Sequence, residues 1–283
     1  MATVMTTTFE LVGADGGPLR GDVRTQSGGA ERPAVVVCHG FKGFKGWGFF
    51  PKLADRLAHG GLTAVSFNFT GSGIGPDGGS FSEPERFGHA TFSRDIEDLD
   101  TVCRELSAGT LAGGVARPTK LGLFGHSRGG GVAVAHAAAH DDIAALTTWA
   151  GIGTVRRWPE EVVARWRRDG KIDVPNARTG DILPLYTDVL DDIDEHEAGK
   201  LDLLKAAGRV RVPWLIMHGD ADETVSLAEA QSFYDAATGD RVKLHIVPGG
   251  SHTMGSRHPW SGSTPELDLA MGETVGWFAK YLF

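Results

Sequence analysis

The chain has 283 residues, of which 41% are hydrophobic and 23% are charged, and these proportions are ordinary for a soluble globular protein. Its formal net charge of −8 argues against a polyanionic nucleic acid as a partner. There is no run of about 18 apolar residues and no basic segment followed by an apolar one at the N-terminus, so neither a membrane span nor a signal peptide is expected. The two cysteines, Cys38 and Cys103, stand in apolar patterns typical of core positions. This usage fits a reducing compartment, and we expect a cytoplasmic protein.

Along the chain, apolar runs typical of buried strands alternate with patterns typical of amphipathic helices. Strands are predicted, in chain order, at 34–38, 62–69, 120–124, 143–150, 212–217 and 242–247. Helices are predicted at 50–59, 91–106, 130–139 and 266–282. The opening segment 9–25 is predicted to add one or two antiparallel edge strands. Because strands alternate with helices, we expect an α/β fold with a mostly parallel central sheet and helices on both faces.

One segment interrupts this alternation. Residues 153–209 are too many for a connection between consecutive strands, and unstructured loops of that length are rare in compact domains. The first part, 159–181, carries charges, turn residues and two tryptophans, whereas 184–207 has a helical pattern. We interpret the whole chain, 1–283, as one domain with a cap-like insertion at 153–209. Ordinary surface helices are the alternative interpretation.

The pentapeptide Gly-His-Ser-Arg-Gly at 125–129 matches the G-x-S-x-G pattern of a nucleophile elbow. An apolar strand precedes it and a helical pattern follows, which is the context that such an elbow requires. The sharp turn lifts the hydroxyl of Ser127 above the sheet edge. Gly125 and Gly129 leave room where strand and helix approach each other. Ser127 is therefore the candidate nucleophile, and a plain glycine-rich turn is the alternative.

A serine nucleophile needs a histidine base, and the histidine needs an acid to orient it. In this chain order the acid should follow a late strand and the base the next one. After strand 212–217 two aspartates compete. Asp222 is the predicted acid because it stands beyond the tight turn, and Asp220 is predicted to bond the turn backbone. After strand 242–247, two glycines lead to His252, which is the predicted base, with His258 as the reserve candidate.

Acyl transfer builds up an oxyanion, which backbone N–H groups must stabilise. One donor is expected from Arg128, the residue after the serine, and the second from Phe41, in the loop after strand 34–38. Gly40 permits close approach of that loop. His39 and His126 lie beside these donors and are expected to form structural hydrogen bonds and not to carry protons.

Taken together, these segments give the chain a specific resemblance. It resembles the α/β-hydrolase fold superfamily, serine-hydrolase type, and in particular the bacterial esterases grouped with cinnamoyl and feruloyl esterases and dienelactone hydrolase-like proteins. The matching segments are 39–41, 66–73, 125–130, 218–222 and 250–252. The resemblance implies a catalytic triad of Ser127, Asp222 and His252. It also implies an oxyanion hole formed by the N–H groups of Phe41 and Arg128.

The resemblance further implies that 153–209 forms a small cap. The chain departs from the usual pattern at Arg128, where many relatives have Gln or Met. It departs again at 70–73, where Thr-Gly-Ser-Gly stands in place of Arg-Gly-His-Gly. Neither departure touches the triad, and both concern the substrate.

Four tryptophans are candidate substrate-binding residues. Trp158 and Trp166 lie in the insertion and are predicted to contact the acyl or alcohol group of the substrate. Trp149 ends a strand near the expected catalytic edge, and Trp260 follows the base loop. For Trp149 and Trp260, a position in the core is an equal alternative.

Two weaker patterns are interpreted as non-functional. Residues 71–75 follow a strand but lack the full G-x-G-x-x-G spacing, so a solvent-side loop is expected there and not a nucleotide site. His136 and His140 stand four apart on a helix, which can suit zinc, but no glutamate for catalysis stands between them. We therefore expect no metal and no organic cofactor.

The sequence thus predicts a serine hydrolase that cleaves small-molecule carboxylic esters, with short-chain or aromatic acyl groups, through an acyl-enzyme. Peptidase or amidase activity and acyl transfer would use the same residues. A hydrolase-fold scaffold that only binds a ligand is the non-enzymatic alternative. The sequence does not indicate the oligomeric state.

Overall fold

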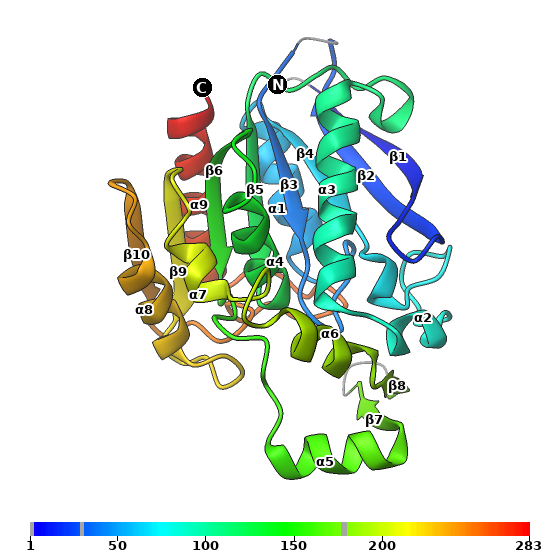
Figure 1. Ribbon diagram of the computed structural model, residues 1–283. Helices are drawn as coiled ribbons and strands as arrows, with labels where there is room; N and C mark the ends of the chain where they lie inside the picture. Colours follow the sequence, from blue (N-terminus) through cyan, green and yellow to red (C-terminus); the bar gives the residue numbers. More distant parts are fainter. Residues whose placement is uncertain (1–2, 29–30, 177–179) are drawn as a thin grey trace.

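The computed structural model describes residues 3–28, 31–176 and 180–283, and within them a single large sheet forms the centre of the molecule (Figure 1). Its strands, in sheet order, are β1 (Val4–Val12), β2 (Pro18–Gln26), β4 (Thr63–Phe67), β3 (Ala34–Cys38), β5 (Leu121–His126), β6 (Ile143–Trp149), β9 (Trp214–Gly219) and β10 (Val242–Val247). β1 pairs with β2, and β2 with β4, in antiparallel register, and all other pairs are parallel. The predicted mostly parallel sheet and antiparallel opening strands are confirmed.

Helices cover both faces of this sheet. α1 (Phe50–His59) and α9 (Pro265–Leu282) pack together on one face. On the other, α3 (Phe92–Ala108) packs against α4 (Arg128–Ala137), which contacts α7 (Leu203–Ala207) and through it α8 (Leu227–Ala236) (Figure 1). The long helices begin at polar caps. Thr91 accepts a hydrogen bond from the Arg94 N–H, and Thr264 does the same for Leu267.

The central strands are buried on both faces. Every residue of β3, β4 and β5 is buried, which explains their continuous apolar sequences. The two cysteines are free and buried, as their apolar surroundings predict. Among the described residues, none of the helices combines the length and apolar character needed to cross a bilayer.

The parallel arrangement gathers six loops at one edge of the sheet. β3, β4, β5, β6, β9 and β10 all point the same way, so the segments that follow them meet at their carboxyl ends. Open α/β sheets bind ligands at this edge. The predicted nucleophile, acid, base and oxyanion donors all lie in these segments.

The long segment between β6 and β9 carries structure of its own. It contains α5 (Glu160–Asp169), β7 (Lys171–Pro175), β8 (Ile182–Tyr186), α6 (Asp188–His196) and α7. β7 and β8 form a small antiparallel sheet apart from the central one. The helical pattern predicted for 184–207 is wrong at its start, where β8 extends to Tyr186. The residues of β8 alternate between more exposed and buried positions, as a strand requires. Figure 1 shows α5, β7 and β8 beyond the strand ends. That 153–209 is a cap stays a prediction.

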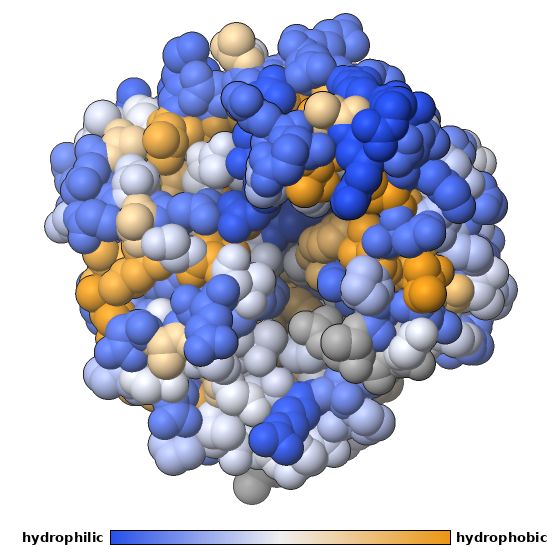
Figure 2. Space-filling view, turned by 90° about the horizontal axis from the view of Figure 1, so that it is seen from below, coloured by the Kyte–Doolittle hydropathy of each residue, from blue (hydrophilic) through white to orange (hydrophobic). Residues whose placement is uncertain are grey.

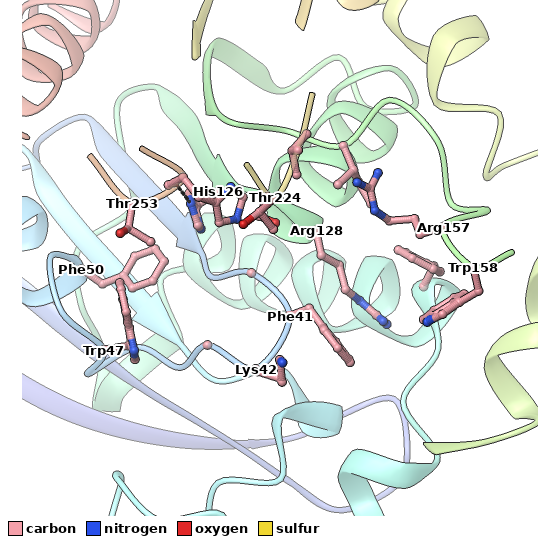
Figure 3. A pocket seen from close by; sticks show the side chains of 17 residues that line it. Phe41, Lys42, Trp47, Phe50, His126, Arg128, Arg157, Trp158, Thr224 and Thr253 are labelled. Carbon is pink, nitrogen blue, oxygen red and sulfur yellow. Dashed lines mark hydrogen bonds between the residues drawn. The ribbon is translucent and has the colours of Figure 1, made fainter. Parts of the chain in front are cut away.

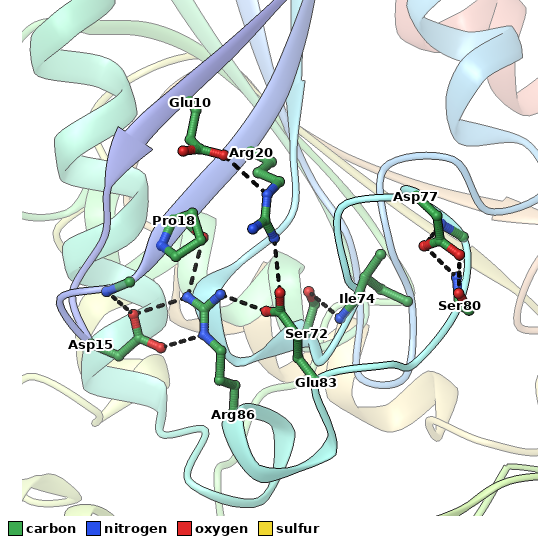
Figure 4. Close-up of polar contacts among 12 residues, drawn as sticks. Glu10, Asp15, Pro18, Arg20, Ser72, Ile74, Asp77, Ser80, Glu83 and Arg86 are labelled. Atoms are coloured by element: carbon green, nitrogen blue, oxygen red, sulfur yellow. Dashed lines mark hydrogen bonds and ion pairs between the residues drawn. The ribbon is translucent and has the colours of Figure 1, made fainter.

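A chain of ion pairs joins the β1–β2 hairpin to the segment that follows β4 (Figure 4). Arg20 bridges Glu10 (3.1 Å) and Glu83 (3.2 Å), and Arg86 bridges Glu83 (2.7 Å) and Asp15 (2.8 Å). Glu83 and Arg86 belong to the turn and first residues of α2 (Pro84–Gly88). The network therefore fixes α2 against the sheet.

The segment under α2 differs from its prediction. Residues 71–75 were expected to form a solvent-side loop, but Ser72 and Ile74 are buried. A short 3-10 turn at Thr70–Ser72 is anchored by Asp98 of α3, which accepts hydrogen bonds from the Thr70 N–H (2.7 Å) and hydroxyl (2.8 Å). Gly73 closes the turn in the left-handed region, with a φ of 75°. The expectation of a solvent-side loop was wrong because α2 covers this segment.

Candidate active site

Ser127 occupies the sharp turn between β5 and α4. Its φ of 56° is unusual for a residue other than glycine and is the kind of strain that functional sites hold. α4 begins at Arg128, directly after the serine and two residues earlier than predicted. A Cβ on Gly125 would lie 2.3 Å from the Gly129 carbonyl oxygen, and one on Gly129 would lie 2.4 Å from the His39 carbonyl oxygen. The turn therefore tolerates no side chain at either glycine.

The loop after β3 passes directly over the nucleophile. A Cβ on Gly40 would lie 3.0 Å from the Ser127 Cβ. The His39 side chain fixes this loop by two hydrogen bonds. Its Nδ1–H donates to the Gly40 carbonyl (2.9 Å), and its Nε2 accepts from the Phe69 N–H (3.2 Å). These contacts agree with the structural role predicted for His39. The backbone of Phe41 is thereby carried to the cavity that Ser127 lines.

The predicted acid and base are hydrogen-bonded to each other. His252 Nδ1 lies 2.8 Å from Asp222 Oδ2, and the Asp222 side chain is fully buried. Asp220 points elsewhere and accepts a hydrogen bond from the Gly249 N–H (2.6 Å). A Cβ on Gly219 would lie 1.9 Å from the Gly250 carbonyl oxygen, so the two loops touch through glycine. With Nδ1 engaged by Asp222, the other ring nitrogen of His252 is the one available to a serine.

Asp222 is held as an anion by several donors. Burial would raise the pKa of Asp222, but hydrogen bonds from His218 and His252 and from the Val225 N–H keep that pKa well below its usual range. His218, fully buried, lies 3.3 Å from Asp222 Oδ2 and donates to the Val225 carbonyl at 2.8 Å. His218, four residues before the predicted acid, had no predicted role, and the structure shows that it contacts Asp222 and the loop that follows.

His126 and His258 also form backbone contacts. His126 Nε2 donates to the carbonyl of His252 (2.8 Å), and the two rings lie 4.7 Å apart. His258 Nδ1 accepts from the Gly48 N–H (3.2 Å), and its ring stacks on Trp47. His126 therefore helps to orient the predicted base, as a structural hydrogen-bonder, and the reserve candidate His258 instead braces the loop before α1.

A cavity of about 370 Å³ opens beside Ser127, on the hollowed face seen in Figure 2. It is lined by Gly40, Phe41, Lys42, Gly43, Trp47, Phe50, Phe92, His126, Ser127, Arg128, Ile152, Arg157, Trp158, Thr224, Val225, His252 and Thr253. In Figure 3 the side chains of Arg128, Arg157 and Trp158 lie together on one side, and those of Trp47 and Phe50 lie on the other. The lining is thus aromatic, with cationic groups at one side.

Of the four candidate substrate tryptophans, only Trp158 is among the residues that line this cavity. Trp149 is fully buried, and its indole N–H donates to Thr274 (2.9 Å), which agrees with the alternative of a core position. Trp166 is also fully buried, with its ring edge-on to Trp158 at 5.1 Å, so the prediction that it contacts substrate was wrong. Trp260 lines a separate surface depression. The strand and helix patterns gave no signal that could separate these cases.

The Arg128 side chain forms a buried ion pair that sequence reasoning missed. Its Nε lies 2.6 Å from Asp95 Oδ2, and its guanidinium lies 4.1 Å over the Phe92 ring. Burial raises the pKa of Asp95, and Arg128 opposes that rise. The pair ties α3 to the first turn of α4, beside the nucleophile. An aspartate three residues into a helix looks like an ordinary N-terminal charge, so the sequence carries no sign of this contact.

Comparisons with known proteins agree with this geometry. A sequence profile described as the Alpha/beta hydrolase family matches residues 35–262. No curated protein is significantly similar in sequence. Among solved structures, the chain is similar to Est1E from Butyrivibrio proteoclasticus, with a TM-score of 0.68, 17% identity, and 97% of this chain and 98% of that chain covered. It is also similar to a dienelactone hydrolase from Anabaena variabilis, with a TM-score of 0.64, 18% identity, and 100% of this chain and 99% of that chain covered.

A third similar structure is the esterase domain of a Rhodothermus marinus protein, with a TM-score of 0.66, 18% identity, and 99% of this chain and 100% of that chain covered. At such identities the likeness concerns the fold. The predicted α/β-hydrolase fold and the predicted likeness to esterases and dienelactone hydrolases are confirmed.

The burial of His39 predicts a pH dependence of stability. Burial lowers the pKa of His39 from its ordinary 6.5 to about 4. Its contribution to stability is therefore complete above pH 6.5 and is lost as the pH falls toward 4, because the unfolded chain binds the proton first. Between pH 7 and pH 5 this loss amounts to about 2 kcal/mol.

We expect His39→Gln to reduce the loss of unfolding free energy between pH 7 and pH 5 by about that amount, measured by urea denaturation. Asp98 titrates in the opposite sense, since burial raises its pKa to about 6, but it is present in both proteins and cancels in the difference. Equal losses in the two proteins would show that His39 is not held neutral.

Proposed function

The chain belongs to the alpha/beta hydrolase family, and we propose that it hydrolyses carboxylic esters of small molecules through a serine acyl-enzyme. The observation that carries the proposal is the assembly around one cavity. Ser127 and His252 both line it, and His252 is hydrogen-bonded at 2.8 Å to a buried Asp222. The similar solved structures include proteins described as esterases, which supports ester cleavage.

In the proposed mechanism the Ser127 oxygen attacks the ester carbonyl while the free nitrogen of His252 accepts the serine proton. Asp222 holds the tautomer of His252 and stabilises the imidazolium that forms. The oxyanion receives hydrogen bonds from the N–H groups of Phe41 and Arg128. His252 then protonates the leaving alcohol, and water repeats the sequence on the acyl-enzyme to release the acid.

The lining of the cavity favours an ester over a peptide with a free amino terminus. The described lining residues contain no carboxylate that could pair with an ammonium group, and two of their cationic side chains already have partners, Arg128 in Asp95 and Arg157 in Glu229. Its volume of about 370 Å³ and its aromatic walls suit a short or aromatic acyl group. These features support esterase over aminopeptidase activity.

The first prediction from this mechanism concerns the nucleophile. We expect the wild-type protein to be labelled by a fluorophosphonate and to hydrolyse p-nitrophenyl acetate. Ser127→Ala should abolish labelling and lower kcat by about 10⁶-fold, because a triad without its nucleophile retains only binding and oxyanion stabilisation. Ser232→Ala, which removes a hydroxyl on α8 that bonds only the Ala228 carbonyl and does not line the cavity, is the control.

An unlabelled wild-type protein would instead support a scaffold that only binds. Faster acyl transfer to an added alcohol than to water would identify an acyltransferase. More than a tenth of wild-type turnover in Ser127→Ala would show that another group is the nucleophile.

A second prediction separates the two aspartates. We expect Asp222→Asn to lower kcat by about 10⁴-fold, because an amide lets His252 adopt the wrong tautomer. Asp220→Asn keeps an oxygen that can accept from the Gly249 N–H and loses only a charge that does not contact His252, so it should keep most activity. Steady-state kinetics on p-nitrophenyl acetate measure both effects, and comparable losses in the two variants would contradict the assignment of the acid.

A third prediction concerns the acyl pocket. Trp158→Ala should lower kcat/KM for an aromatic acyl ester relative to an acetyl ester by about 10- to 200-fold, or roughly 1–3 kcal/mol, because only the bulky group contacts the ring. Trp260→Ala, outside the cavity, is the matched control. If the two variants changed the ratio equally, Trp158 would not determine specificity, and the walls formed by Phe41 and Trp47 would be tested next.

A further inference from the structure

Two histidines and an aspartate meet on the outer side of the α3–α4 pair, at the end of α4 away from Ser127. Asp100 comes from α3, His136 from the last turn of α4, and His140 from the residues just after that helix. One candidate ligand atom from each lies within 4.8 Å of the other two. His136 is eight residues beyond the start of α4, about 12 Å along its axis, so the cluster is separate from the catalytic cavity.

The spacing within the cluster fits a shared ion better than a hydrogen bond. His140 Nε2 lies 3.8 Å from Asp100 Oδ1, which is too long for a direct hydrogen bond. Two ligands of a tetrahedral zinc ion, each about 2.1 Å from it, lie about 3.4 Å from each other. The other carboxylate oxygen, Oδ2, accepts a hydrogen bond from Arg104 at 3.1 Å. Arg104 thus steadies Asp100 and leaves Oδ1 facing His140.

His136 supplies a second, independent observation. Its side chain is only 1% exposed, yet its Nδ1 has no hydrogen-bond partner among the described residues. Buried polar atoms without a partner are costly and uncommon, so such an atom calls for an explanation. The His136 ring stacks on the His140 ring with centroids 4.0 Å apart. The buried imidazole thus lies directly against a half-buried one.

We propose that Asp100, His136 and His140 form a binding site for a divalent transition-metal ion of the zinc type, with water completing its coordination. Two imidazoles and one carboxylate are a donor set that zinc accepts. The His140 ring must turn out of its stacked position to point a nitrogen at the ion. It is free to do so because it follows the end of α4 and its side chain is 37% exposed.

The sequence pattern alone supplied two ligands, four residues apart, and no third. Asp100 comes from a different helix, and only the packing of α3 against α4 brings it to the histidines (Figure 1). Because the site joins these helices and lies far from Ser127, the ion is expected to stabilise the fold and to take no part in hydrolysis.

The test is zinc binding by the full chain without an affinity tag, after treatment with a chelator. Isothermal titration with ZnCl₂ at pH 7.5 should show one site per chain, and the melting temperature should rise by about 2 °C or more in excess zinc. His140→Ala and Asp100→Asn change side chains that are only half-buried, so both proteins should fold. Each should weaken binding at least about tenfold, because a lost ligand removes one coordinate bond.

Two controls remove histidines elsewhere. His59→Ala alters an exposed histidine of α1, and His252→Ala alters the predicted base, and both should bind zinc as the wild type does. The absence of a zinc site in the wild type would overturn the proposal. The proposal would also be overturned if His59→Ala weakened zinc binding as much as His140→Ala does. The same holds if His252→Ala lost zinc binding while His140→Ala kept it. Since the readout is binding and melting, the result does not depend on the proposed esterase activity.

Discussion

Close backbone contact at the carboxyl edge of the sheet is the constraint on which the site depends. The elbow touches the loop after β3 at Gly129, where a Cβ would lie 2.4 Å from the His39 carbonyl oxygen. The loops after β9 and β10 touch at Gly219, where a Cβ would lie 1.9 Å from the Gly250 carbonyl oxygen. Each contact joins two segments that are distant in sequence, and their backbones lie so close together that no side chain fits between them. The glycines therefore set the separations within the site before any catalytic side chain contributes.

Buried charged groups also fix the positions of the segments at this edge. Asp222 is surrounded by donors from His218 and His252 and from the loop backbone, and Arg128 is paired with Asp95 under the nucleophile. A buried ion pair adds little net stability, because desolvation offsets the attraction, but removing one partner leaves an uncompensated charge. Moving either partner of such a pair out of place is therefore costly in free energy. In this chain the pairs fix the loop that carries Asp222 and the first turn of α4.

Features that depend on interactions between neighbouring residues could be predicted from the sequence, and features that depend on contacts between distant segments could not. The elbow, the alternation of strands and helices, and the aspartate-bearing turn after strand 212–217 depend on short patterns of glycine and apolar residues. The mostly parallel sheet and the positions of Ser127, Asp222 and His252 on its edge could therefore be predicted. The pairing of Asp95 with Arg128, and the burial of residues 71–75 under α2, depend on contacts between distant segments. The tryptophans show the same limit. Trp149 ends β6 and Trp158 lies in the segment that follows it, and only the packing around them decides which one faces the cavity.

The packing of α3 against α4 relates the catalytic edge to the proposed metal site. Both helices run away from the catalytic edge. Asp95 meets Arg128 at the beginning of α4, and Asp100, about 1.4 turns farther along α3, meets His136 near its end. α3 thus offers a carboxylate to each end of α4. The first contact is a completed ion pair with both partners buried. The second joins a buried imidazole, whose Nδ1 has no partner among the described residues, to two half-buried side chains that solvent reaches, so only the second can be completed by an ion from solution. A metal there would act on α4 as Asp95 does at the other end, by fixing its position relative to α3. Its effect would appear in the stability of the fold and not in the geometry of Ser127.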